Sequence, residues 1–78
     1  MRTLILYSRP ECHLCELLAE ELTPLLQGRA VLKHVDVGSD PALERRYGFR
    51  VPVLAVDGAE LSGYPLDRER VERFFSQA

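Results

Sequence analysis

The order of apolar and polar residues divides the first third of the chain into a strand and a helix. Residues 3–7 (TLILY) form an apolar run without polar alternation, which predicts a short strand covered on both faces. From Cys12 onward, leucines recur at helical spacing with glutamates between them, which predicts a helix that begins near this residue. Pro24 has no N–H to donate inside a helix, so we expect the helix to end or kink there, with Gly28 closing the segment.

The middle of the chain predicts a second strand and a second helix. Residues 30–37 are rich in β-branched side chains and follow the first strand by about one helix, so the two strands should pair in parallel through a right-handed crossover. Residues 41–47 predict a short helix, because Ser39 and Asp40 supply a cap ahead of a proline at the first helical position. Gly48 lies where a C-terminal glycine is expected.

The last third predicts a hairpin and a third helix. Residues 53–56 and 59–62 flank an Asp-Gly pair that suits a type I′ turn. Asp67 can cap a final helix whose apolar stripe consists of Val71, Phe74 and Phe75. The predicted order is therefore β-α-β-α-β-β-α, an α/β architecture.

Composition and charge narrow the possible functions. The 78 residues are 46% hydrophobic and 28% charged, which is typical of one globular core. Twelve acids oppose ten bases without a long run of either sign, so we expect no nucleic-acid partner. The N-terminal residues contain no long apolar segment, so we expect neither signal peptide nor membrane span. These features predict a single cytoplasmic domain over residues 1–78.

The only two cysteines, Cys12 and Cys15, lie at the predicted start of the first helix. Unpaired N–H groups and the positive end of the helix dipole stabilise a thiolate there, so Cys12 is the candidate attacking nucleophile. Cys15, about one turn later, can close a disulfide onto Cys12 and displace a bound partner. His13 could favour the thiolate when protonated, or could be a solvent-facing residue of the first turn. His34, on the second strand, is most simply structural.

These features resemble the glutaredoxin-like branch of the thioredoxin fold over essentially the whole chain. The resemblance rests on Leu-Tyr-Ser-Arg-Pro-Glu-Cys-His-Leu-Cys at 6–15 and Arg-Val-Pro-Val at 50–53. It implies a thioredoxin fold with a four-stranded mixed sheet flanked by three helices. It further implies that Pro52 is cis beside the dithiol and that the backbone of Val51 binds the substrate peptide. Arg9 matches a basic residue that glutaredoxins carry before the first cysteine, which makes it a candidate for binding a substrate carboxylate or the thiolate.

Several positions depart from the family pattern. Leu14 stands where the family's tyrosine lines the glutathione groove, and Asp67 lies one position later than expected. Gly63 and Asp67 could present a helix N-terminus to a substrate carboxylate, or could serve only turn formation and capping. Arg50 precedes the Val-Pro pair and is a candidate for holding an anionic peptide. Tyr7, Tyr47 and Phe49 are expected to be packing residues.

The sequence thus predicts a small dithiol thiol–disulfide oxidoreductase that reduces protein or small-thiol mixed disulfides. We expect a monomer without metal or tightly bound cofactor. Electrons would come from the glutathione system, another small thiol, or a thioredoxin-reductase-like enzyme. Two other hypotheses remain open. Two CxxC pairs of a dimer could bind zinc or an iron–sulfur cluster, or the chain could be a non-catalytic docking module that binds a partner strand at the Val51 backbone and the hairpin edge.

Overall fold

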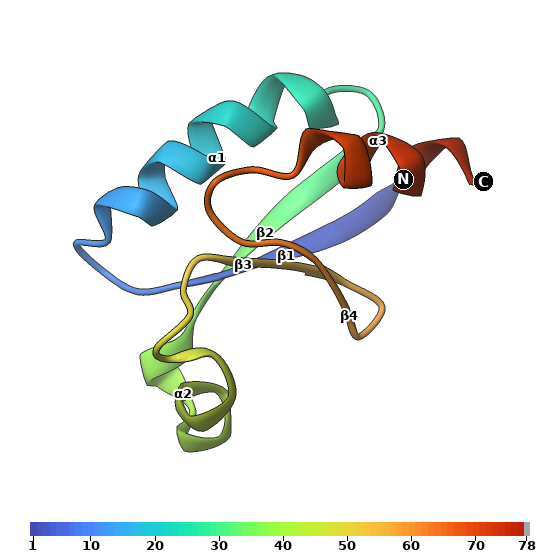
Figure 1. Ribbon diagram of the computed structural model, residues 1–78. Coiled ribbons are helices and arrows are strands. Elements are labelled where there is room, and N and C mark those ends of the chain that lie inside the picture. Colours follow the sequence, from blue (N-terminus) through green and yellow to red (C-terminus); the bar gives the residue numbers. More distant parts are fainter. Residues whose placement is uncertain (78) are drawn as a thin grey trace.

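The computed structural model describes residues 1–77 and shows the predicted order of elements (Figure 1). A short 3-10 helix, η1, adds to that order between the second strand and the second α-helix. The elements are β1 (Arg2–Ser8), α1 (His13–Leu26), β2 (Ala30–Asp36), η1 (Val37–Ser39), α2 (Pro41–Tyr47), β3 (Val53–Val56), β4 (Ala59–Ser62) and α3 (Arg68–Ser76).

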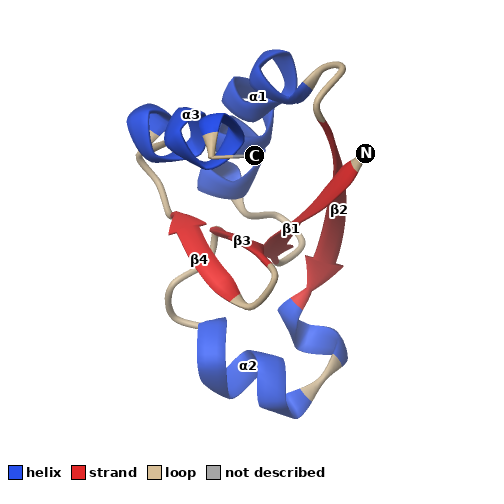
Figure 2. Cartoon of the chain, turned by 90° about the vertical axis from the view of Figure 1, so that its right-hand side faces the viewer, coloured by secondary structure: helices blue, strands red, loops and turns tan. Residues whose placement is uncertain are grey.

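The four strands form one mixed sheet in the order β2-β1-β3-β4. β1 pairs in parallel with β2, whereas β3 is antiparallel to both β1 and β4. Helices α1 and α3 cover one face of the sheet and α2 covers the other, as Figures 1 and 2 show from two directions. The α/β thioredoxin-like architecture expected from the sequence is therefore confirmed.

Alternate side chains of β1 point to opposite faces of the sheet. Leu4 and Leu6 are fully buried in the larger apolar cluster, which also contains Leu18 and Leu22 of α1 and Val71 of α3. Burying a leucine side chain contributes about 1.5–3 kcal/mol, so this layer is the main source of stability. A smaller cluster faces α2, and in it the rings of Tyr7 and Tyr47 stack with their centroids 4.2 Å apart.

Helix α1 differs from the prediction at Pro24. The helix continues through this residue to Leu26 rather than ending there. Pro24 lies in the last turn, so it removes only the bond to the carbonyl of Glu20, and both residues are exposed. The hydroxyl of Thr23, the residue before Pro24, donates to the carbonyl of Ala19 one turn earlier at 2.8 Å. Gly28 follows with φ 76°, a conformation suited to glycine.

The other element boundaries follow local side-chain chemistry. Asp40 and Asp67 cap α2 and α3 as predicted, each accepting a hydrogen bond from a backbone N–H of the first turn. Asp57 and Gly58 have φ of 50° and 81°, which fits the predicted type I′ turn. The second strand ends one residue earlier than expected, because the carboxylate of Asp36 accepts from the N–H of Gly38 and caps η1.

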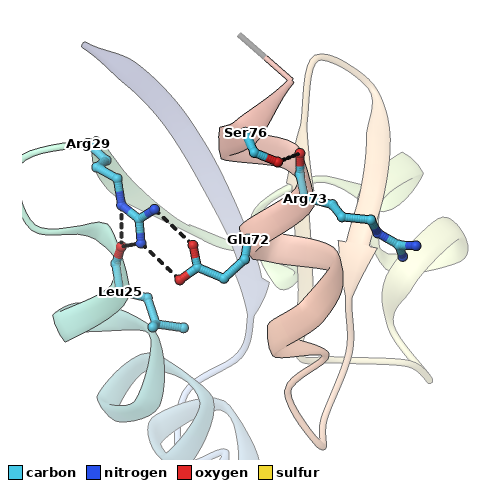
Figure 3. A network of polar contacts seen from close by, with 5 residues as sticks. All are labelled: Leu25, Arg29, Glu72, Arg73 and Ser76. Atoms are coloured by element: carbon cyan, nitrogen blue, oxygen red, sulfur yellow. Dashed lines mark hydrogen bonds and ion pairs between the residues drawn. The ribbon is translucent and has the colours of Figure 1, made fainter.

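The two helices on one face are joined at the end of α1. Arg29 donates from Nε and Nη2 to the carbonyl of Leu25, at 3.0 and 2.6 Å, and from Nη1 to Glu72 of α3 at 2.9 Å (Figure 3). The guanidinium also lies 4.5 Å above the ring centre of Phe75. The hydrogen bond from Arg29 lowers the pKa of Glu72.

Within residues 1–77, no helix has the length and apolar character needed to cross a membrane.

Candidate active site

The two cysteines lie where β1 turns into α1. Glu11 has φ 59°, an uncommon conformation for a residue with a side chain, and Cys12 follows as the N-cap of the helix. The Sγ of Cys12 accepts a hydrogen bond from the N–H of Cys15 at 3.2 Å. The two residues form a disulfide, with their Cα atoms 5.2 Å apart. A thiolate at Cys12 would thus accept a backbone N–H of the first helical turn.

The two sulfur-bearing residues differ in exposure. Cys12 is half-buried, whereas Cys15 is buried, with 5% of its surface exposed. An incoming disulfide can therefore reach Cys12 from solvent. Cys15 lies on the buried side of Cys12. This arrangement suits attack by Cys12 and resolution by Cys15.

The loop before β3 lies at the same end of the sheet as Cys12. Tyr7 pairs with Val53 in antiparallel register, so Pro52 lies opposite the end of β1 that leads into the cysteine loop. The Val51-Pro52 bond is cis, as the family resemblance implies, and Pro52 is buried. The Tyr64-Pro65 bond is also cis, and no pattern in the sequence predicts this.

Arg9 contacts the protein itself. Its guanidinium forms a two-pronged ion pair with Glu44 of α2 and donates to the carbonyl of Gly48 at 2.8 Å. The hydrogen bond to Glu44 raises the pKa of Arg9, against an opposing effect of desolvation. Arg9 thereby fastens the cysteine loop to the end of α2. Glu44 lies 35 positions away, and no local pattern in the sequence signals the pairing.

Gly48 makes room for this ion pair. It is the C-cap of α2 in a right-handed conformation, with φ −52° and ψ −36°, so its backbone does not require glycine. A Cβ at this position would collide with the carboxylate and the carbonyl of Glu44 and would lie 3.1 Å from Nη2 of Arg9. Glycine therefore suits this position because a side chain would not fit, and not because of the backbone conformation.

Arg50 is also engaged within the chain. It donates to the two carboxylate oxygens of Glu60 at 2.7 and 3.1 Å and to the carbonyl of Arg46 at 3.0 Å. This pairing lowers the pKa of Glu60, with the hydrogen bond as the main cause. An anionic peptide at Val51 would have to compete with Glu60 for this guanidinium.

The other predicted site residues, apart from the cysteines and the Val-Pro pair, lie in separate parts of the chain. Gly63 lies next to the proline loop, because a Cβ there would be 3.5 Å from the carbonyl of Pro52. Asp67 caps α3, and its own N–H donates to the hydroxyl of Ser62 at 2.9 Å. His13 is exposed, and its Nδ1 is 3.9 Å from a carboxylate oxygen of Glu16.

A depression of about 460 Å³ opens beside the disulfide, between α1 and the edge strand β2. Both cysteines line it together with His34, a residue expected from the sequence to be structural. The other lining residues are Leu6, Ser8, Arg9, Glu11, Glu16, Ala19 and Glu20. Among residues 1–77, no cluster of three or more His, Cys, Asp or Glu side chains is placed to hold a metal ion.

Two apolar side chains near the site are exposed. Leu14, inside the cysteine motif, has 46% of its surface exposed. Phe49, in the loop that leads to Val51, is fully exposed, so the expectation that it packs against the protein is wrong. Tyr7 and Tyr47 do pack, as expected, in the cluster beneath α2.

Comparisons with known proteins agree with this architecture. The family model described as Glutaredoxin-like domain (DUF836) matches residues 3–76. The X-ray structure of target protein XcR50 from X. campestris is 38% identical over 96% of this chain and 97% of that one, with a TM-score of 0.76. The solution structure of the same target covers 100% of this chain and 96% of that one at the same identity, with a TM-score of 0.74.

A more distant structure shows the fold alone. A thioredoxin variant from Halobacterium salinarum NRC-1 is 23% identical over 96% of this chain and 72% of that one, with a TM-score of 0.64. No curated protein matches the chain by sequence. Because the family model covers nearly the whole chain, the chain belongs to the family of glutaredoxin-like domains (DUF836), and it has a thioredoxin-like fold.

Proposed function

We propose that this protein is a dithiol oxidoreductase that reduces protein or small-thiol mixed disulfides. The observation that carries the proposal is the asymmetry of the cysteine pair. Cys12 caps α1 and its Sγ accepts the N–H of Cys15, while Cys15 is buried beneath it. Placement at a helix N-terminus favours the thiolate, which is the form that attacks disulfides.

The reaction then proceeds by two exchanges. The Cys12 thiolate attacks one sulfur of a substrate disulfide, forms a mixed disulfide and releases the other sulfur as a thiolate. Cys15 next attacks the Sγ of Cys12, which closes the intramolecular disulfide, releases the second substrate thiolate and sets free the proton of Cys15. The substrate gains two electrons, which a thiol or flavoenzyme donor must return to the protein.

The side chains around the cysteine pair bear on which electron donor the protein uses. Arg9 is paired with Glu44 and Arg50 with Glu60, so neither guanidinium is free to meet a glutathione carboxylate without exchanging partners. Leu14 offers an exposed apolar surface in place of a hydroxyl. We therefore propose that a protein donor of the thioredoxin-reductase type supports faster turnover than glutathione does.

A coupled reduction assay tests both parts of the proposal. The protein is supplied in parallel with glutathione plus its reductase and with thioredoxin reductase, and NADPH consumption is followed with a model disulfide as substrate. We expect faster turnover with thioredoxin reductase than with glutathione and its reductase, and loss of turnover in Cys12→Ser. Undiminished turnover in Cys12→Ser would refute the mechanism, and faster turnover with glutathione would refute the choice of donor.

A further inference from the structure

The second exchange releases a proton, and the depression beside the disulfide contains a group suited to take it. We propose that His34 is the proton acceptor for the Cys15 thiol when that thiol attacks the mixed disulfide at Cys12. This inference rests on the proposed redox function and assigns a role to a residue outside the cysteine motif. Its first support is that His34, Cys12 and Cys15 line the same depression.

The register of the sheet explains how a residue of the edge strand reaches this place. His34 pairs with Leu6, and Leu32, two residues earlier, pairs with Leu4 in the same parallel ladder. Leu4 and Leu6 point into the core beneath α1, and Leu32 packs against that core. Side chains of paired residues lie on the same face of a sheet, so His34 also faces α1, near the helix end that carries the cysteines.

The environment of Cys15 creates the need for an acceptor. Only 5% of this residue is exposed, and Leu6 and Ala19 lie with it along the depression. Burial of a thiol disfavours its thiolate, which is the attacking form. Transfer of the thiol proton to the His34 imidazole, directly or through one water, yields the thiolate as the S–S bond forms. The imidazolium then gives its proton to solvent, so the step balances without a further reactant.

The other charged groups facing the depression are less suited to the task. Arg9, from the cysteine loop, has no acceptor atom and is paired with Glu44. Glu11 from the same loop and Glu16 and Glu20 from α1 are carboxylates, which are weak bases at neutral pH. Histidine is the side chain that ordinarily changes charge between about pH 5 and 8, so its participation has a distinctive pH signature.

A stopped-flow experiment separates the two exchanges. The reduced full chain is mixed with an excess of an aromatic disulfide whose released thiolate absorbs visible light. The first equivalent of thiolate reports attack by Cys12 and depends on probe concentration, whereas the second reports resolution by Cys15 and does not. Parent, His34→Gln and Lys33→Gln are compared across about pH 5 to 8. Lys33 is the matched control, because it is exposed on the same strand and its side chain lies on the opposite face.

We expect His34→Gln to slow the second phase at least about tenfold near pH 7. It should also change the pH dependence of that phase, because only the Cys15 thiolate already present at each pH can then attack, while leaving the first phase unchanged. Added imidazole should partly restore the rate, and Lys33→Gln should behave as the parent. An unchanged second phase with an unchanged pH profile in His34→Gln would overturn the inference and leave the redox function standing. Absence of the first phase in the parent would overturn the proposed function and this inference together.

Discussion

Replacement of Gly48 by alanine tests whether the contact between the cysteine loop and α2 is as tight as the structure shows. Two effects of opposite sign compete. Because φ and ψ at Gly48 suit alanine, the loss of freedom in the unfolded chain should stabilise the variant by about 0.4–1 kcal/mol. The added methyl group, however, would collide with Glu44 and press against Arg9. Overpacking of this kind typically costs about 1–3 kcal/mol.

The steric effect should win, so we expect Gly48→Ala to lower the free energy of unfolding by about 1 kcal/mol or more. For a domain of this size, each kcal/mol corresponds to a Tm lower by roughly 4–8 °C. Urea and thermal unfolding of the oxidised protein would measure the change. Gly63→Ala is the control, because a Cβ there makes only an ordinary 3.5 Å contact with the carbonyl of Pro52.

Truncation of Glu44 in the same background gives a second readout. Glu44→Ala removes the carboxylate that the new methyl group would meet, so the two substitutions together should cost less than the sum of their separate effects. A Gly48→Ala variant that is as stable as the parent, or more stable, would refute the proposed crowding around Arg9. Equal destabilisation by Gly63→Ala would show that the effect is not specific to this contact.

Two further predictions concern the cysteine pair and the second arginine. Cys15→Ser should trap mixed disulfides at Cys12, detectable as a mass increase that a reductant reverses; recovery of only unmodified protein after exposure to a disulfide would contradict the assigned roles. The pKa of Glu60 is lowered by Arg50, so their pair should stabilise the fold above the usual glutamate value of 4.5 and lose this effect as the pH falls below it. Because both side chains are partly exposed to solvent, which screens the ion pair, Arg50→Gln should lower the free energy of unfolding only slightly near neutral pH. Urea titrations should show the difference from the parent shrinking below about pH 4.5, whereas a difference that is constant with pH would exclude this ion pair as its cause.

The fold was readable from the sequence because its signals are local. The apolar run of β1, the helical leucines and the Asp-Gly turn each describe their own segment, and all were found in the structure. The helix ends at Leu26, two residues beyond the end predicted at Pro24, because a proline in the last helical turn removes only one backbone bond. The cis bond before Pro52 came from the family resemblance, whereas the one before Pro65 had no such guide.

The site was only partly readable, because several of its contacts depend on sheet register and on distant segments. The spacing of Cys12 and Cys15 identified the reactive pair. The partner of Arg9 lies on α2, and His34 reaches the depression only through its alignment with Leu6 in the neighbouring strand. Neither relation leaves a local pattern. The sequence also did not indicate that Phe49 is exposed, because an aromatic residue between two elements usually packs against the protein.

The central claim, that Cys12 attacks and Cys15 resolves, is tested most directly by alkylation of the reduced protein. One equivalent of iodoacetamide is added near neutral pH, and the modified cysteine is identified by peptide mass spectrometry. The half-buried N-cap position of Cys12 and the burial of Cys15 predict that the label appears almost entirely on Cys12. Equal labelling of the two residues, or preferential labelling of Cys15, would contradict the account.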